Sequence, residues 1–199
     1  MLKIILTAIM AFLLAGCTVA SPYVSEFRIN PTILDSEVRA QTCNGKTLKV
    51  AKAFSSSALM SQNMNYGFGD YKIGSFTESQ WAESPNREIT SHILKTLQSA
   101  GLFKSALISN SKSRSDLVLE TNIEEFTQFF SQDQKSSTVK VTISNTLIDA
   151  KTNTALRTKT FEQSEKAETL DAEGGVAALN KALSVVLTRQ RDWLSGICE

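Results

Sequence analysis

The sequence has a single histidine, only three cysteines and no excess of charge of either sign. Its 199 residues carry 21 Lys and Arg against 20 Asp and Glu. A nucleic-acid-binding domain concentrates basic residues on one surface, and a balanced chain offers no such excess. With His92 alone, the sequence has neither a histidine pair for a metal site nor a second imidazole for a proton relay. We expect no metal, no cofactor and no nucleic-acid partner, and we expect His92 at a helix surface or boundary.

The common catalytic motifs are also missing. No CxxC pair, nucleophile elbow or phosphate-binding loop occurs, and the G-x-G at Gly67 lacks a third glycine and a following helix. The densest carboxylates are Glu124 with Glu125, and Glu162 with Glu165. Adjacent strand residues point to opposite faces, so Glu124 and Glu125 can share a site only across a bulge. Solvated strand faces explain these carboxylates, and we expect no catalytic residue and no enzyme.

No apolar run is long enough to span a bilayer, but the N-terminus carries a shorter one. Ile4 to Gly16 has no charge and falls short of the roughly 20 residues that a membrane helix needs. The run suits a secretory signal peptide. It ends in Leu14-Ala15-Gly16-Cys17, which resembles the lipobox of bacterial lipoproteins. The alternative is an ordinary secretory signal with a chance cysteine.

The lipobox resemblance implies cleavage before Cys17 and attachment of a diacylglyceryl group and an N-acyl chain such as palmitate. We therefore expect residues 1–16 to be a signal peptide, residues 17–25 a lipidated N-terminus and tether, and residues 26–199 one folded domain. The residue after the cysteine is Thr18 and not Asp, and resemblance to the sorting pattern of enterobacterial lipoproteins implies the outer membrane of a Gram-negative bacterium, facing the periplasm.

The two remaining cysteines are candidates for a disulfide. An oxidising periplasm makes a Cys43–Cys198 bridge plausible chemistry, and it would close a loop of more than 100 residues. The alternative is two unpaired thiols, one buried and one at the chain terminus.

The periodicity of apolar residues predicts a sheet with two helices. We expect strands at "SEFRI", at Leu48–Phe54, in "NMNYGFGDYKIGSF", taken as one strand with glycine turns or bulges, and in "LFKSALIS". From Asp116 onward, period-two alternation predicts three consecutive strands in an antiparallel meander. The predicted fold class is α+β: a single domain with a mixed or antiparallel twisted sheet and two amphipathic helices packed on one face.

The two helices have clear start signals. Ser84-Pro85 has the form of an N-cap followed by proline at the first helical position, and Gly101 suits a left-handed C-cap. An apolar stripe between them predicts a helix of about 16 residues. A second stripe that begins after Asp171 predicts the last helix.

Aromatic residues are the remaining candidates for function. Trp81 stands just before the first helix, where it could line a site, anchor a partner or pack the crossover; packing fits best because no catalytic residue converges on it. Phe126, Phe129 and Phe130 exceed what the inner face of one strand needs. They either cap the core beneath the helices or form an exposed apolar patch for a subunit, partner or lipid.

The stretch from Tyr71 to Phe103 resembles the ABC-type transport auxiliary lipoproteins. The resemblance is carried by the tyrosine-containing strand (Tyr66, Tyr71), Trp81-Ala82-Glu83-Ser84-Pro85, the following helix and Gly101-Leu102-Phe103, and it extends over about residues 26 to 195. It implies a non-enzymatic component that accompanies a permease, an ATPase and a mammalian-cell-entry type substrate-binding protein in transport of lipid or other hydrophobic cargo. It also implies that a homo-oligomeric ring is possible. Lys72-Ile73-Gly74 after the strand tyrosine departs from the family's pattern.

Two other functions compete with this one. An outer-membrane assembly lipoprotein that partners a barrel protein would share the lipobox and the two-helix, one-sheet layout. A periplasmic enzyme would require Glu125 or Glu162 to be essential for turnover.

Overall fold

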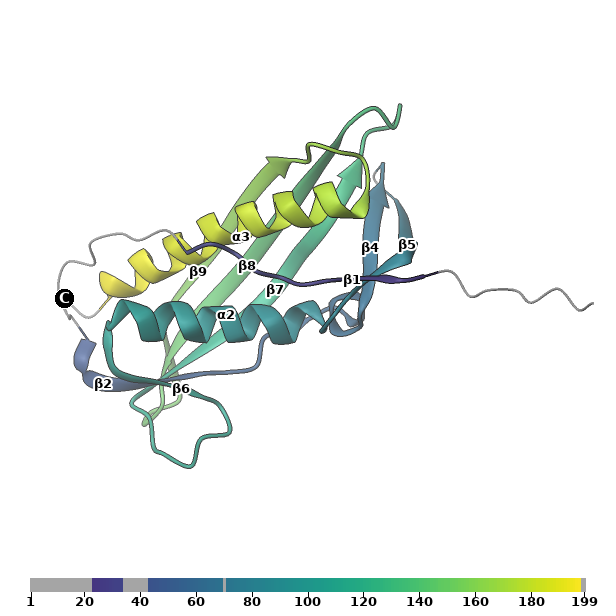
Figure 1. Ribbon diagram of the computed structural model, residues 1–199. Helices are drawn as coiled ribbons and strands as arrows, with labels where there is room; N and C mark the ends of the chain where they lie inside the picture. The colour runs from purple at the N-terminus through teal and green to yellow at the C-terminus, as the bar shows by residue number, and fades with distance from the viewer. Residues whose placement is uncertain (1–22, 34–42, 70, 198–199) are drawn as a thin grey trace, which may run out of the picture.

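Two long helices lie on one face of a curled nine-stranded sheet (Figure 1). The computed structural model describes residues 23–33, 43–69 and 71–197. Its elements are β1 (Ser25–Phe27), β2 (Cys43–Val50), β3 (Phe54–Ser55), η1 (Ser57–Met60), β4 (Asn63–Phe68), β5 (Lys72–Trp81), α2 (Pro85–Ala100), β6 (Phe103–Ile108), β7 (Leu117–Phe130), β8 (Ser137–Asp149), β9 (Thr154–Lys166) and α3 (Ala172–Ser195). The predicted α+β class and the placement of both helices on one face are confirmed.

The long strand β7 is the spine of the sheet. On one side it pairs antiparallel with β8 along its whole length, from Leu117 opposite Asp149 to Phe130 opposite Ser137, and β8 pairs antiparallel with β9. The predicted meander is therefore confirmed. The inner residues of β7 are buried as the alternation predicted, at Leu117, Leu119, Thr121 and Ile123.

On its other side β7 pairs with three short strands in turn, all parallel to it. β2 meets its first residues, β3 its middle and β4 its end, where Phe68 stands opposite Phe130. The stretch predicted as one strand from Leu48 to Phe54 is two, because the chain leaves the ladder after Val50 and rejoins it at Phe54. β6 pairs parallel with β2, and β1 pairs parallel with β5.

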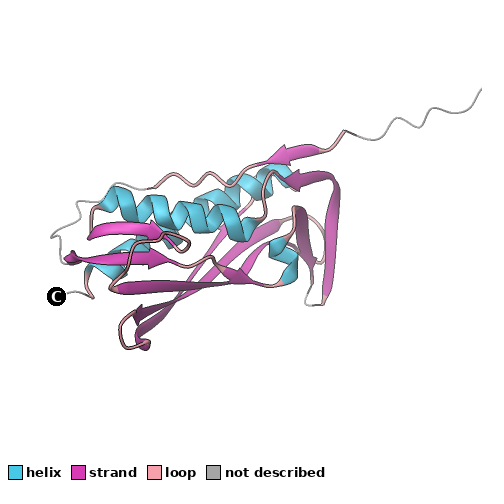
Figure 2. Cartoon of the chain, turned by 90° about the horizontal axis from the view of Figure 1, so that it is seen from below, coloured by secondary structure: helices cyan, strands magenta, loops and turns pink. Residues whose placement is uncertain are grey.

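The prediction of one strand in residues 63–76 is wrong. β4 and β5 form an antiparallel hairpin, and β5 continues to Trp81. Gly69 has a φ of 59°, a conformation that glycine adopts without steric cost and other residues rarely adopt, and this allows the reversal. The pairing slips between Asn63, opposite Gln80, and Asn65, opposite Ser75, so β5 holds extra residues there. The hairpin lies at one end of the molecule, on the right of both views (Figures 1 and 2).

Helix α2 begins and ends as predicted. Ser84 is extended, Pro85 occupies the first helical position, and Gly101 is left-handed with a φ of 62° and donates its N–H to the Gln98 carbonyl. Ser84 makes no side-chain capping bond, so proline and the backbone set the start. The inner stripe of Ile89, Ile93 and Leu97 is fully buried.

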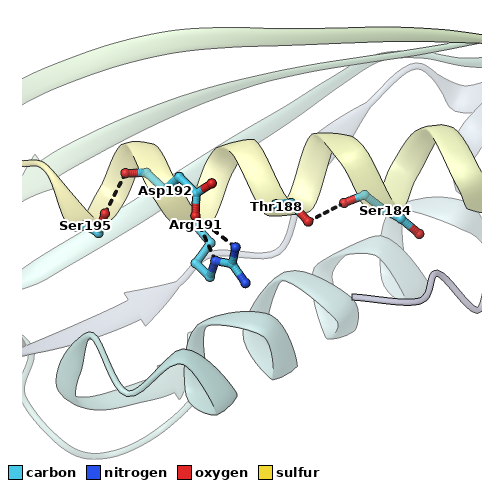
Figure 3. Close-up of polar contacts among 5 residues, drawn as sticks. All are labelled: Ser184, Thr188, Arg191, Asp192 and Ser195. Carbon is cyan, nitrogen blue, oxygen red and sulfur yellow. Dashed lines mark hydrogen bonds and ion pairs between the residues drawn. The ribbon is translucent and has the colours of Figure 1, made fainter. Parts of the chain in front are cut away.

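Helix α3 lies beside α2 and carries polar residues on a covered surface. Asp171 caps it by accepting from the Gly174 N–H at 2.9 Å. Thr188 donates to the Ser184 carbonyl one turn earlier, so its hydroxyl needs no external partner (Figure 3). The Arg191 side chain is 4% exposed and its guanidinium pairs with Asp192 Oδ1 at 2.9 Å, which balances the charge (Figure 3).

The segment after β1 passes between the two helices and is fixed to both (Figure 1). Ile29 is 2% exposed; its N–H donates to Glu88 Oε2 at 2.8 Å, and its carbonyl oxygen lies 2.8 Å from His92 Nε2. The Asn30 N–H donates to Asn180 Oδ1 at 2.7 Å. His92 is thus half-buried at the edge of the inner face of α2, as expected, and its ring holds this segment. Within the described ranges, no helix is both long and apolar enough to cross a membrane.

Candidate interaction surface at the β4–β5 hairpin

The hairpin and the end of β7 bring aromatic side chains from three strands together. β4 lies between its two partners: Gly67 stands opposite Phe129 on β7 and opposite Ile73 on β5, and Phe68 stands opposite Phe130 and Lys72. Residues that stand directly opposite each other on paired strands project from the same face of the sheet, so this pairing determines on which face each aromatic lies.

One face holds a cluster of Tyr66, Phe76 and Phe130. The Tyr66 ring centroid lies 5.0 Å from that of Phe76 and 5.4 Å from that of Phe130, the latter edge-on. These are favourable separations for aromatic pairs. The cluster lines an open depression of about 590 Å³, which Phe68, Lys72 and Ile73 also line. The Tyr66 ring covers the space where a Cβ at position 74 would stand, so any other residue there would displace that ring.

The other face holds Phe129, whose ring lies over Gly67. A second depression of about 330 Å³ adjoins it and is lined by Tyr71, Lys72, Ile73, Glu124 and Glu125 among others. Lys72 and Ile73 therefore border both depressions.

Glu124 and Glu125 line this second depression together because β7 has a bulge there. Ile123 pairs with Ile143 and Glu125 with Thr142, which leaves Glu124 as the extra residue. Glu124 Oε1 accepts from the Ser144 hydroxyl, which also lies 2.6 Å from Thr160 Oγ1. Glu124 is therefore exposed and hydrogen-bonded to the neighbouring strand β8.

The other carboxylates singled out from the sequence bind lysines. Glu162 Oε2 lies 3.1 Å from Lys140 Nζ, and Glu165 Oε2 lies 2.8 Å from Lys181 Nζ. The hydrogen bond from Lys181 lowers the pKa of Glu165, and the same bond raises the pKa of Lys181. Both carboxyl groups have structural partners.

The tip of the hairpin is apolar and open to solvent. We define the hairpin tip as Phe68, Tyr71, Lys72 and Ile73. Tyr71 is 95% exposed and Ile73 is 80% exposed. The Lys72 ammonium nitrogen lies 5.9 Å from the centre of the Phe68 ring, so it stands beside the apolar surface. Asp70 lies outside the described residues.

The candidate aromatics separate into two groups. Tyr71, Phe129 and Phe130 belong to the surface just described. Trp81 and Phe126 are 4% and 3% exposed, with ring centroids 5.7 Å apart, and belong to the core. Cys43 is buried, whereas Cys17 and Cys198 lie outside the described residues.

Sequence reasoning missed Phe68, Ile73 and Phe76 as members of the surface. Their signal was present in the glycines at 67, 69 and 74, which mark a turn and two close ring contacts. A hairpin at this point would have placed all three residues beside the Phe129–Phe130 pair.

Solved structures show the same fold. The chain is similar to a protein of Xanthomonas campestris from the DUF330 family, with a TM-score of 0.77 and 15% identity over 85% of this chain and 94% of that one. A second crystal structure, of an uncharacterised protein, gives a TM-score of 0.66 and 13% identity over 87% and 99%. At such identities the likeness concerns the fold. No curated protein matches the chain.

The family assignment comes from the sequence. The model of the ABC-type transport auxiliary lipoprotein component matches residues 32–189. That range includes both helices except the end of α3, the hairpin and all of the meander. This chain therefore belongs to the ABC-type transport auxiliary lipoprotein family.

Proposed function

We propose that the protein is a non-catalytic auxiliary component of an ABC-type transport system of the mammalian-cell-entry type. It would help to move lipid or another hydrophobic solute between the inner and outer membranes. The family match over residues 32–189 carries this proposal. The apolar surface at the hairpin supports it, because a component that works beside membranes and hydrophobic cargo has a use for exposed apolar side chains.

Membership of a lipoprotein family places the protein in the cell envelope. The further proposals are acylation of Cys17, residence at the outer membrane facing the periplasm, and a Cys43–Cys198 disulfide. Replacing Cys17 by Ala tests the first: labelling of the protein with palmitate in growing cells should disappear. Labelling that persists in Cys17→Ala would contradict acylation at this residue.

The non-catalytic role is supported by the surroundings of the carboxylates. Glu124 is bonded to Ser144, and Glu162 and Glu165 are paired with lysines. As a test, Glu125→Gln and Glu162→Gln should leave transport-dependent growth unchanged. A complete loss of function in either variant, with the protein still folded, would favour an enzyme.

The partner is tested by purifying the full-length lipoprotein from envelope membranes in mild detergent and identifying the proteins that accompany it. We expect a permease, an ATPase and a mammalian-cell-entry type substrate-binding protein. Recovery of an outer-membrane barrel protein in their place would favour the assembly-lipoprotein alternative and contradict the proposal. The size of any homo-oligomer recovered in the same detergent would test whether the protein forms a ring.

A further inference from the structure

The most exposed apolar side chains gather where the N-terminal tether leaves the domain. Among the described residues, the three most exposed large hydrophobic side chains are Tyr71 at 95%, Tyr23 at 86% and Ile73 at 80%. Tyr71 and Ile73 belong to the hairpin tip, and Tyr23 lies two residues before the start of β1. β1 pairs with β5, with Ser25 opposite Ser79, so the tether and the hairpin arise from neighbouring strands.

We infer that the hairpin tip rests on the surface of the same bilayer that holds the lipid anchor, with Tyr71 and Ile73 at the boundary of headgroups and acyl chains. The inference rests on the proposed acylation of Cys17. It adds a second membrane contact and thereby an orientation of the domain, neither of which acylation alone supplies.

The length of the tether allows this contact. Eight residue steps separate Cys17 from Ser25, and covalent geometry limits them to about 29 Å. Ile73 stands six residues before Ser79 on β5, which is at most about 20 Å along a strand. The hairpin tip can therefore reach the bilayer while the acylated Cys17 is inserted in it.

The point from which the tether departs is fixed. The Ile29 backbone is bonded on one side to Glu88 and on the other to His92, and Asn30 is bonded to Asn180. Because these bonds join the segment after β1 to both helices, and β1 itself pairs with β5, the domain cannot release further chain without breaking them. The tether length is thus defined, and the hairpin stays within reach of the membrane.

The chemistry of the tip suits a lipid surface. Tyrosine is enriched at membrane interfaces because its ring is apolar and its hydroxyl is polar. Lys72 stands between Tyr71 and Ile73 in sequence, and a lysine can lay its methylene stem along an apolar surface and keep its ammonium group among the headgroups. Tethering makes this second contact intramolecular, so a weak interaction suffices.

The test places reporters in the full-length acylated protein, reconstituted into vesicles of phosphatidylethanolamine and phosphatidylglycerol with or without brominated acyl chains. Tyr71→Trp reports on the hairpin tip, and Ile73→Trp is a second reporter at the same place. Leu156→Trp is the matched control: Leu156 is 45% exposed on β9. Unsubstituted protein gives the background of the buried Trp81 and partly buried Trp193.

The control lies far from the hairpin. Leu156 is near the start of β9, beside the end of β8, which in turn pairs with the first residues of β7, whereas the hairpin meets the end of β7. Leu117 and Phe130 stand 13 residues apart, which is about 43 Å along the strand.

We expect brominated lipid to quench roughly half of the tryptophan emission added by Tyr71→Trp or Ile73→Trp, because interfacial insertion places such side chains about 5–10 Å deep. The emission added by Leu156→Trp should be unchanged. If the protein remains bound to the vesicles and no reporter is quenched, the inferred contact between the hairpin and the bilayer is wrong, whereas acylation of Cys17 is not contradicted. Equal quenching of the hairpin and control reporters also overturns it. A blue-shifted but unquenched Tyr71→Trp would show that protein covers the tip instead. Protein that does not remain with the vesicles would refute the acyl anchor, and with it this inference.

Discussion

The Phe129 ring lies directly over Gly67, in the space that a side chain at position 67 would occupy. The two residues stand opposite each other on β7 and β4, so this contact joins the hairpin to the spine of the sheet. The absence of a Cβ at position 67 is what lets the ring approach the neighbouring strand so closely.

Gly67→Ala should therefore displace Phe129 and lower the free energy of unfolding by about 1–3 kcal/mol. Gly45→Ala is the matched control in another strand, because nothing lies within 4 Å of a Cβ built there. In Phe129→Ala the added methyl group has room, so Gly67→Ala should cost at least about 1 kcal/mol less in that background. Urea unfolding of the unsubstituted protein and of the four variants measures these costs; equal costs of Gly67→Ala in both backgrounds would contradict the contact.

Two of the aromatics singled out from the sequence, Phe126 and Tyr71, should differ in how much they contribute to the free energy of unfolding. Phe126 is 3% exposed and packs on Trp81, so Phe126→Ala should lower the free energy of unfolding by about 3–5 kcal/mol. Tyr71 is 95% exposed, so Tyr71→Ala should change it by no more than about 0.5 kcal/mol. Circular dichroism during urea unfolding separates the two. A large effect of Tyr71→Ala would place that side chain in the fold and not on a free surface.

Local chemistry explains what the sequence predicted correctly. Ser84-Pro85 and Gly101 determine where α2 begins and ends through backbone conformations that act within a few residues. The period-two alternation of β7 and β8 places the correct residues inward, because one face of that meander is covered by helices.

Long-range pairing explains what the sequence did not predict. Whether residues 63–81 form one strand or a hairpin depends on β4 pairing with the end of β7, 62 residues away in the chain at Tyr66 and Gln128. The bulge at Glu124 likewise depends on the register with β8. Trp81 ends β5 and Tyr71 directly precedes it, but only the position of the strand relative to the core decides that the first is buried and the second exposed.

The cap of α3 predicts a pH dependence of stability. The Gly174 N–H and then the Thr169 hydroxyl donate to the Asp171 carboxylate and lower its pKa below the ordinary value. A carboxyl group whose pKa is lower in the folded state stabilises the fold above its unfolded pKa, near 4. That contribution is lost as the pH falls through 4 toward the folded pKa.

Asp171→Ala should therefore lower the free energy of unfolding by about 1 kcal/mol at pH 7, the usual effect of removing an N-cap. The difference from the unsubstituted protein should shrink as the pH falls below about 4. Asp171→Ser is the control, since a serine hydroxyl can accept the Gly174 N–H without titrating. Unfolding curves between pH 3 and pH 7 would contradict the cap if Asp171→Ala and Asp171→Ser behaved alike.

The proposed Cys43–Cys198 bridge would join the start of β2 to the end of the chain. Cys43 is 2% exposed, and Ile197, the residue before Cys198, packs against the core. The end of α3 and β2 lie at the same end of the molecule (Figure 1). Cross-linking so long a loop restricts the unfolded chain, so the bridge should raise the free energy of unfolding by about 2–5 kcal/mol.

Cys198→Ser should remove that contribution, and a reducing agent should destabilise the unsubstituted protein by the same amount without affecting Cys198→Ser. Mass spectrometry of an unreduced digest should detect a single species that contains the peptides of both cysteines. Free thiols at both positions in protein taken from the periplasm would refute the bridge. Cys43→Ser is a poorer test, because it also places a hydroxyl group in a buried position, where an unsatisfied polar group is itself destabilising.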